Sequence, residues 1–111
     1  MNAISALGLH KDSDEATQIL VEITKEKDQA RTYDVQSSII ALGVQGSAQA
    51  KEIIKSFLKD KNPSLRGAAC IAIAEYGDKE LYPLLREMSD DDSIDVQNAL
   101  SVIKTRFKLI K

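Results

Sequence analysis

Apolar side chains recur along this chain at the three- and four-residue spacing of amphipathic α-helices. This spacing predicts helices at residues 14–27, 34–44, 47–59, 64–76, 78–89 and 94–107, joined by short polar turns. Residues 1–9 resemble the end of one further helix. No stretch alternates apolar and polar side chains over five residues, so we expect no β-strands. The pattern therefore predicts an all-α chain.

The helical pattern itself repeats about every 31 residues, and each period contains two helices. Gly46 and Gly77 are one such period apart, and Ile40, Ile71 and Val102 follow one another at the same step. Matching apolar positions follow the two glycines: Ala50, Ile53, Ile54 and Phe57 after the first, and Leu81, Leu84, Leu85 and Met88 after the second. A two-helix period of this length is typical of a stacked helical-repeat array.

Local signals predict where the helices begin and end, and which faces they bury. We expect N-caps at Asp14, Ser47 and Ser64, and we expect Gly43 and Gly46 to end the helix at 34–44. The apolar stripe of the first helix should bury Ala16, Ile19, Leu20 and Ile23. Each helix pair leaves an apolar face that only the neighbouring pairs can cover.

One segment carries a recognisable family pattern. Residues 60–73 combine an acidic turn, an apolar residue followed by arginine, and a run of small residues. Gly77-Asp78 and then Leu81-Tyr82-Pro83 add a glycine-acid turn and a first helix that contains proline. This pattern resembles the HEAT-repeat family, in the short variant of phycobilisome-lyase-like proteins. The resemblance implies a right-handed α-α superhelix, an armadillo-like solenoid, of about three helix pairs.

The resemblance also implies a domain organisation and an inter-repeat ladder. We expect one domain over residues 1–111, with repeats at about 14–45, 46–76 and 77–108, and residues 1–9 left from a preceding repeat of a longer array. In this family a turn aspartate and an arginine six residues later form a ladder, and Asp60 and Arg66 match those positions. Gln97 replaces the arginine after Asp91, so we expect no continuous ionic ladder.

Composition excludes several classes of function. The chain has 15 basic and 17 acidic residues, whereas a nucleic-acid surface such as that of HEAT-fold DNA glycosylases usually needs a basic excess. Cys70 is the only cysteine, so no internal disulfide can form, and its apolar neighbours predict a buried thiol. The sequence has no long apolar run and no signal-peptide pattern, so we expect no membrane span and a cytoplasmic location.

The candidate chemical groups do not assemble into a catalytic or metal site. The acidic run Asp90-Asp91-Asp92 lacks the glycine and glutamate that a calcium loop requires, so we expect it to cap the next helix. His10 is the only histidine, and Lys11 follows it. Iron-binding HEAT enzymes resembling deoxyhypusine hydroxylase need His-Glu dipeptides, which this chain lacks. We therefore expect no enzymatic activity, no metal and no cofactor.

The more informative feature is one helical face. The resemblance places the second helix of each pair on the concave side of the array. Family members commonly carry charge where this chain has the β-branched side chains Ile40, Ile71 and Val102. An apolar row there would suit a peptide or helix of a partner protein. The candidate partner-binding residues are Ile40, Gly67, Cys70, Ile71, Ala74, Asn98 and Val102.

These observations favour a non-catalytic scaffold or adaptor that binds a protein partner. Two alternatives are an accessory subunit of a chromophore-lyase-like enzyme and a structural spacer within a larger HEAT-repeat protein. The apolar row could also be half-buried between helices or covered by another part of a longer protein. The chain should be a monomer or a weak dimer that stacks end to end through residues 1–9.

Overall fold

A computed structural model of the chain describes residues 14–26 and 31–106, and all regular structure in these ranges is helical. The helices are α2 (Asp14–Thr24), α3 (Thr32–Gln45), α4 (Ala48–Phe57), α5 (Pro63–Tyr76), α6 (Tyr82–Glu87) and α7 (Ile94–Arg106). Two 3₁₀ turns, η2 (Lys79–Leu81) and η3 (Met88–Asp90), flank α6. The prediction of an all-α fold is confirmed.

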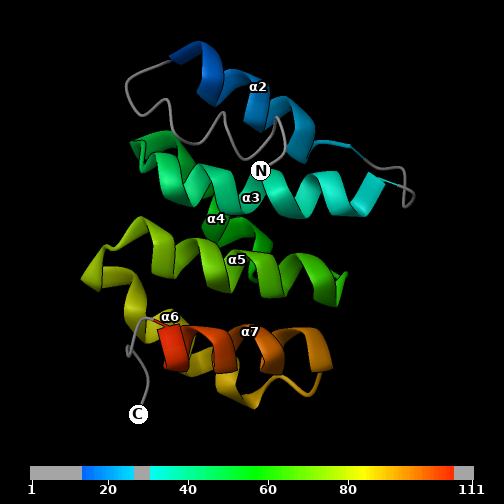
Figure 1. The fold of residues 1–111 in the computed structure, drawn as a ribbon, viewed down its shortest axis with the longest axis vertical. Coiled ribbons are helices and arrows are strands. Elements are labelled where there is room, and N and C mark those ends of the chain that lie inside the picture. The colour runs from blue at the N-terminus through cyan, green and yellow to red at the C-terminus, as the bar shows by residue number, and fades with distance from the viewer. Residues whose placement is uncertain (1–13, 27–30, 107–111) are drawn as a thin grey trace.

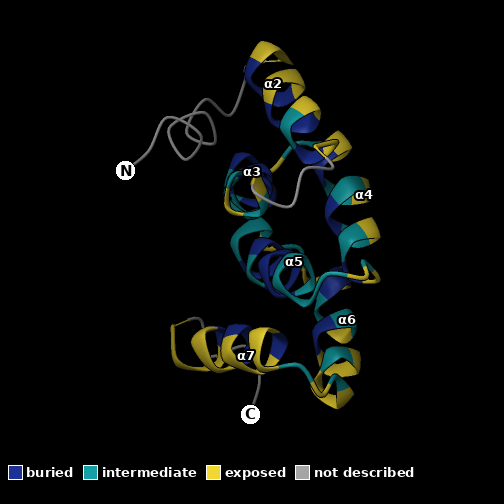
Figure 2. Ribbon diagram, turned by 90° about the vertical axis from the view of Figure 1, so that its right-hand side faces the viewer, coloured by how far each residue is buried: buried dark blue, intermediate teal, exposed yellow. Residues whose placement is uncertain are grey.

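The helices form two layers. Figure 1 shows α3, α5 and α7, the second helices of the three pairs, stacked side by side with their axes nearly parallel. In Figure 2 these helices form one column, α4 and α6 form the other, and α2 lies at the top and slants toward α4. The buried residues lie mainly where the two columns meet, and α5 is packed between α3 and α7. This arrangement is the stacked array of helix pairs that the sequence period predicts.

The core is aliphatic, as the composition requires. Its largest fully buried side chains include Leu20, Ile39, Leu42, Ile54, Ile73, Leu85 and Ile103. One expectation in α2 is wrong, because Ile19 is 42% exposed and Val21 is buried instead. The buried face of α2 therefore includes Thr17 and Thr24, and the Thr24 hydroxyl is satisfied by donating to the carbonyl oxygen of Val21.

The helix N-caps differ in part from the prediction. The Ser47 side chain accepts the N–H of Ala50, as expected for an N-cap. In α5, however, Asn62 is the N-cap and accepts the N–H of Ser64 at 2.9 Å. The shift arises because Pro63, with a fixed backbone angle and no N–H, suits the first helical position. Asp14 is likewise the first residue of α2 rather than a cap before it.

Two glycines inside the second helices set how closely these helices pack. Gly46 ends α3 in the left-handed conformation, whereas Gly43 lies within the helix and is buried. A Cβ on Gly43 would overlap the Ala72 carbonyl oxygen and lie 2.8 Å from the Ala72 Cα. A Cβ on Gly67 would lie 2.9 Å from the Asp95 carbonyl oxygen. The second helices therefore approach backbone to backbone, while the backbones of the first helices α4 and α6 lie farther apart.

Candidate partner-binding groove

A groove of about 420 Å³ crosses the three second helices. Each of α3, α5 and α7 contributes one residue to each of four sets, and the members of a set are one repeat period apart. The sets are Tyr33, Ser64 and Asp95; Gln36, Gly67 and Asn98; Ser37, Ala68 and Ala99; and Ile40, Ile71 and Val102. The sequence period is therefore also the register in which the helices stack at the groove.

One side of the groove is apolar and the other is polar. The set Ile40, Ile71 and Val102, here called the apolar row, keeps accessible surface, and Val102 is 43% exposed. Tyr33 lies at the opposite edge and is 68% exposed. Between these edges the floor consists of Gly67 and other small side chains. The groove thus offers apolar contact next to hydrogen-bonding groups, a combination common in ligand-binding pockets.

The structure separates the candidate residues into two groups. Ile40, Gly67, Ile71, Asn98 and Val102 all line the groove. Cys70 and Ala74 do not, because they are only 0% and 5% exposed and pack in the core. These two side chains cannot contact a partner in this conformation, so their prediction as partner-binding residues is wrong.

The burial that removes Cys70 from the surface also makes its thiol inert. Loss of solvent raises the pKa of this thiol to about 12, and the Asp91 carboxylate acts in the same direction, while Arg66 opposes both. Reactive cysteines are accessible and have a lowered pKa. Cys70 is therefore a small core residue, in line with the buried thiol that its apolar neighbours predict.

Sequence reasoning missed the polar edge of the groove, formed by Tyr33, Ser64 and Asp95, as well as Ser37. The sequence spacing does indicate this edge, because positions seven residues apart lie on the same face of a helix, two turns apart. Counting back seven residues from each member of the apolar row gives Tyr33, Ser64 and Asp95. Gln36 also donates from Nε2 to the carbonyl oxygen of Ser64, which links α3 to α5 at this edge.

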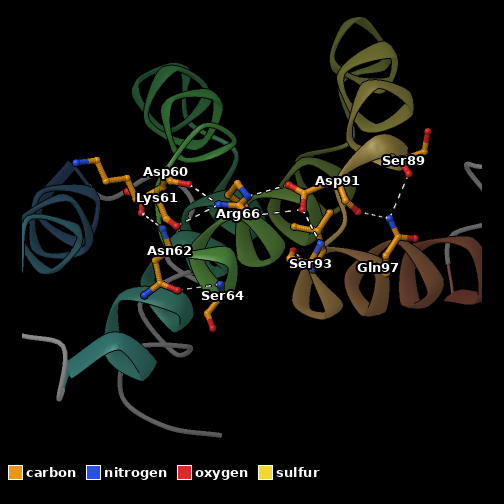
Figure 3. Close-up of polar contacts among 10 residues, drawn as sticks. Asp60, Lys61, Asn62, Ser64, Arg66, Ser89, Asp91, Ser93 and Gln97 are labelled. Carbon is orange, nitrogen blue, oxygen red and sulfur yellow. Dashed lines mark hydrogen bonds and ion pairs between the residues drawn. The ribbon is translucent and has the colours of Figure 1, made fainter.

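Arg66 fixes the position of α5 relative to α7 near this edge. Its Nε and Nη2 donate to the Asp91 carboxylate at 2.8 and 3.4 Å, and its Nη1 donates to the carbonyl oxygens of Asp60 and Lys61 (Figure 3). The sequence pattern places Asp60 and Arg66 together in the ladder. The structure shows that Asp60 contributes its carbonyl group, whereas its carboxylate accepts the N–H of Asn62.

The Arg66–Asp91 ion pair is partly shielded from solvent, since the two side chains are 20% and 17% exposed. Hydrogen bonds from the Arg66 guanidinium, and then from the Ser93 backbone N–H, lower the pKa of the Asp91 carboxyl. The ladder does not continue as an ion pair in α7, where Gln97 takes the place of the arginine. The Gln97 amide instead donates to the carbonyl oxygens of Asp91 and Ser89 in its own repeat (Figure 3).

The acidic turn before α7 has a structural role that differs from the expected one. The Ser93 hydroxyl, rather than an aspartate, accepts the Val96 N–H at the start of α7. Asp91 orders the turn by accepting the Ser93 N–H. Within residues 14–26 and 31–106, no three His, Cys, Asp or Glu side chains are grouped as metal ligands. His10 and the helix expected at residues 1–9 lie outside the described residues.

None of the helices in the described part of the chain is both long enough and apolar enough to cross a bilayer. The aliphatic faces of these helices are instead used for packing between the two layers. The groove is one accessible, partly apolar surface of the second-helix layer in the described residues.

Comparison with known proteins agrees with this architecture. A family model described as HEAT repeats matches residues 33–104, which is more than half of the chain and covers α5 and most of α3 and α7. No curated protein and no solved structure matched the sequence. HEAT repeats are commonly protein-interaction scaffolds and are typically non-catalytic. On this match and on its stacked helix pairs, the chain belongs to the HEAT-repeat family.

Proposed function

We propose that this chain is a non-catalytic interaction module that binds a segment of a partner protein in the groove across α3, α5 and α7. The observation that carries the proposal is the apolar row, which lines the groove: Val102 is 43% exposed, while Ile40 and Ile71 are partly buried against the core and keep some accessible surface. Accessible apolar side chains rimmed by polar groups are a feature of protein-binding surfaces.

The rigidity of the groove supports binding. Its floor is formed by Gly67, Ala68 and Ala99, and the close approach at Gly67 leaves little freedom for α5 to move against α7. A surface that is already ordered loses less conformational entropy when a partner binds. The exposed ring of Tyr33 adds a side-chain type that is enriched among residues with large contributions to binding energy.

The proposal can be tested with a library of random 16-residue peptides displayed on phage. Peptides are selected on the wild-type chain and then tested against Ile71→Glu and Val102→Glu, which place a charge in the apolar row. Ala48→Glu is the matched control, because Ala48 is exposed at the start of α4, outside the groove lining. Circular dichroism and thermal unfolding establish that each variant is folded.

The expected result is a set of peptides that bind the wild-type chain and Ala48→Glu but bind at least tenfold more weakly to both groove variants. A tenfold change in affinity corresponds to about 1.4 kcal/mol, and burying an unpaired charge costs more than that. Val102→Glu is informative if Ile71→Glu unfolds, because Val102 is the more exposed residue. If folded groove variants bind every selected peptide as well as the wild-type chain does, the proposal is wrong.

A further inference from the structure

The carboxylate of Asp95 stands out among the charges near the groove. Asp34 accepts from Arg31 at 3.2 Å, and Asp91 is paired with Arg66. No hydrogen bond or ion pair reaches the Asp95 side chain from any residue in 14–26 or 31–106. The groove lining contains no lysine, arginine or histidine. Among the described residues, Asp95 is thus a negative charge without a basic partner on the polar side of the groove.

Neighbouring charges add to the negative potential at this place. Asp90 and Asp92 lie in the turn that precedes α7, and both are exposed with no ion pair in the described structure. Since Arg66 and Asp91 neutralise each other, they do not offset these charges. In the described part of the chain, Asp95 is the one charged residue in the lining of the groove, and its negative charge attracts ligands of the opposite sign.

The position of Asp95 relative to the apolar row specifies the shape of the ligand. Asp95 and Val102 are seven residues apart on α7, which is about 10.5 Å along the helix axis. This separation is the width of the groove, and Tyr33 and Ile40 give the same width on α3. An α-helix with its side chains has a diameter of about 10–12 Å, which matches this width. Three helices at about 8–10 Å spacing give the groove a length of roughly 16–20 Å. A bound helix of about 11–13 residues has this length.

On the basis of the function proposed above, we infer that the groove binds an amphipathic helix with a basic flank. The helix lies across α3, α5 and α7, with its apolar stripe against the apolar row and a lysine or arginine next to Asp95. The apolar row supplies the area of contact, whereas Asp95 selects the sign of the charge on the flank. This selection is the usual contribution of charged groups at an interface rim.

The test uses the same phage-displayed library with three baits: the wild-type chain, Asp95→Asn and Asp95→Lys. Wild-type selection should enrich lysine or arginine at a fixed offset beside an apolar stripe with helical spacing. Selection on Asp95→Lys should lose this preference and enrich aspartate or glutamate at the same offset. Asp92→Asn is the matched control, since it removes an acidic charge from the turn but not from the groove lining.

The magnitude is measured by fluorescence anisotropy with one selected peptide and its Lys→Gln counterpart. Asp95→Asn should weaken the lysine peptide about two- to fivefold, the range of an exposed ion pair, and leave the glutamine peptide unchanged. Asp92→Asn should leave the binding of both peptides within twofold of wild type. Added salt should reduce the difference between the two peptides, because exposed ion pairs are screened.

Two failures can be distinguished. If selected peptides lose binding to Ile71→Glu but show no basic preference, or if Asp95→Asn binds both peptides as the wild type does, the inference is wrong and the proposed function stands. If no selected peptide is sensitive to Ile71→Glu or Val102→Glu, the proposed function and the inference are both wrong.

Discussion

Replacing Gly43 with alanine tests the backbone contact between α3 and α5. Gly43 is buried within α3, and an added Cβ would overlap the Ala72 carbonyl oxygen and lie 2.8 and 2.9 Å from the Ala72 Cα and carbonyl carbon. Ordinary van der Waals contact begins at 3.4 Å, so α3 and α5 must move apart. Substituting Ala72 cannot relieve the overlap, because the contacted atoms belong to its backbone.

The net effect follows from two opposing terms. Alanine is a better helix former than glycine by about 1 kcal/mol, which favours the variant. Overpacking a core costs about 1–3 kcal/mol or more, and a gap of about 0.5–1 Å forfeits a quarter to a half of each dispersion contact. Ile39, Leu42 and Ile73 are fully buried near this contact and would lose such contacts. We expect a net loss of about 2 kcal/mol in the free energy of unfolding.

The assay is urea and thermal unfolding followed by circular dichroism, with Gly46→Ala as the control. Gly46 has a φ of 74° and no atom within 4 Å of an added Cβ, so its replacement causes backbone strain of about 1–2 kcal/mol but no change in helix spacing. Gly43→Ala should lower the melting temperature by roughly 10 °C. A Gly43→Ala chain as stable as the wild type, or more stable, would refute the close approach of α3 and α5.

Three further predictions concern other parts of the fold. The pKa of Asp91 is lowered in the folded state, so its ion pair with Arg66 stabilises the fold above about pH 4 and is lost at lower pH. The difference in unfolding free energy between wild type and Asp91→Asn, measured in urea, should therefore shrink as the pH falls from 7 to 3. Because burial raises the pKa of the Cys70 thiol to about 12, a disulfide reagent at pH 8 should react with the urea-unfolded chain and far more slowly with the folded chain. Asn62→Ala should cost about 1 kcal/mol in unfolding free energy, whereas Ser64→Ala should cost much less, because Asn62 and not Ser64 caps α5.

The sequence predicted the fold well because its repeat period is a property of the fold. Apolar spacing located all six described helices, and the repeat step matched the register of the stacked helices at the groove. Caps were harder to predict, because several residues near a helix start can accept an N–H. The choice of Asn62 over Ser64 depends on Pro63, whose fixed φ places it at the first helical position.

The site was predictable only in part. The apolar row follows from the period alone, but exposure depends on how α5 is rotated against both neighbours. That rotation buries Cys70 and Ala74 while leaving Ile71 half-buried. The family pattern indicated that Arg66 takes part in a ladder between repeats, but it did not show that the paired carboxylate belongs to Asp91 of the next repeat while Asp60 offers its carbonyl oxygen. Pairing of this kind depends on three-dimensional contacts that helical spacing does not encode.

The unequal packing of the two layers has a mechanical consequence. The second helices are held at short range by backbone contacts at Gly43 and Gly67, which resist compression. The backbones of the first helices α4 and α6 lie farther apart, and a space of about 380 Å³ between these helices is lined by Leu84 of α6 and by Leu58 and Met88, which follow α4 and α6. Bending of the array should therefore open or close the α4–α6 space while the second-helix layer keeps its dimensions. The second-helix layer, which carries the groove, would be the stiffer side of the molecule, so force applied along the array should change its curvature before it changes the shape of the proposed binding groove.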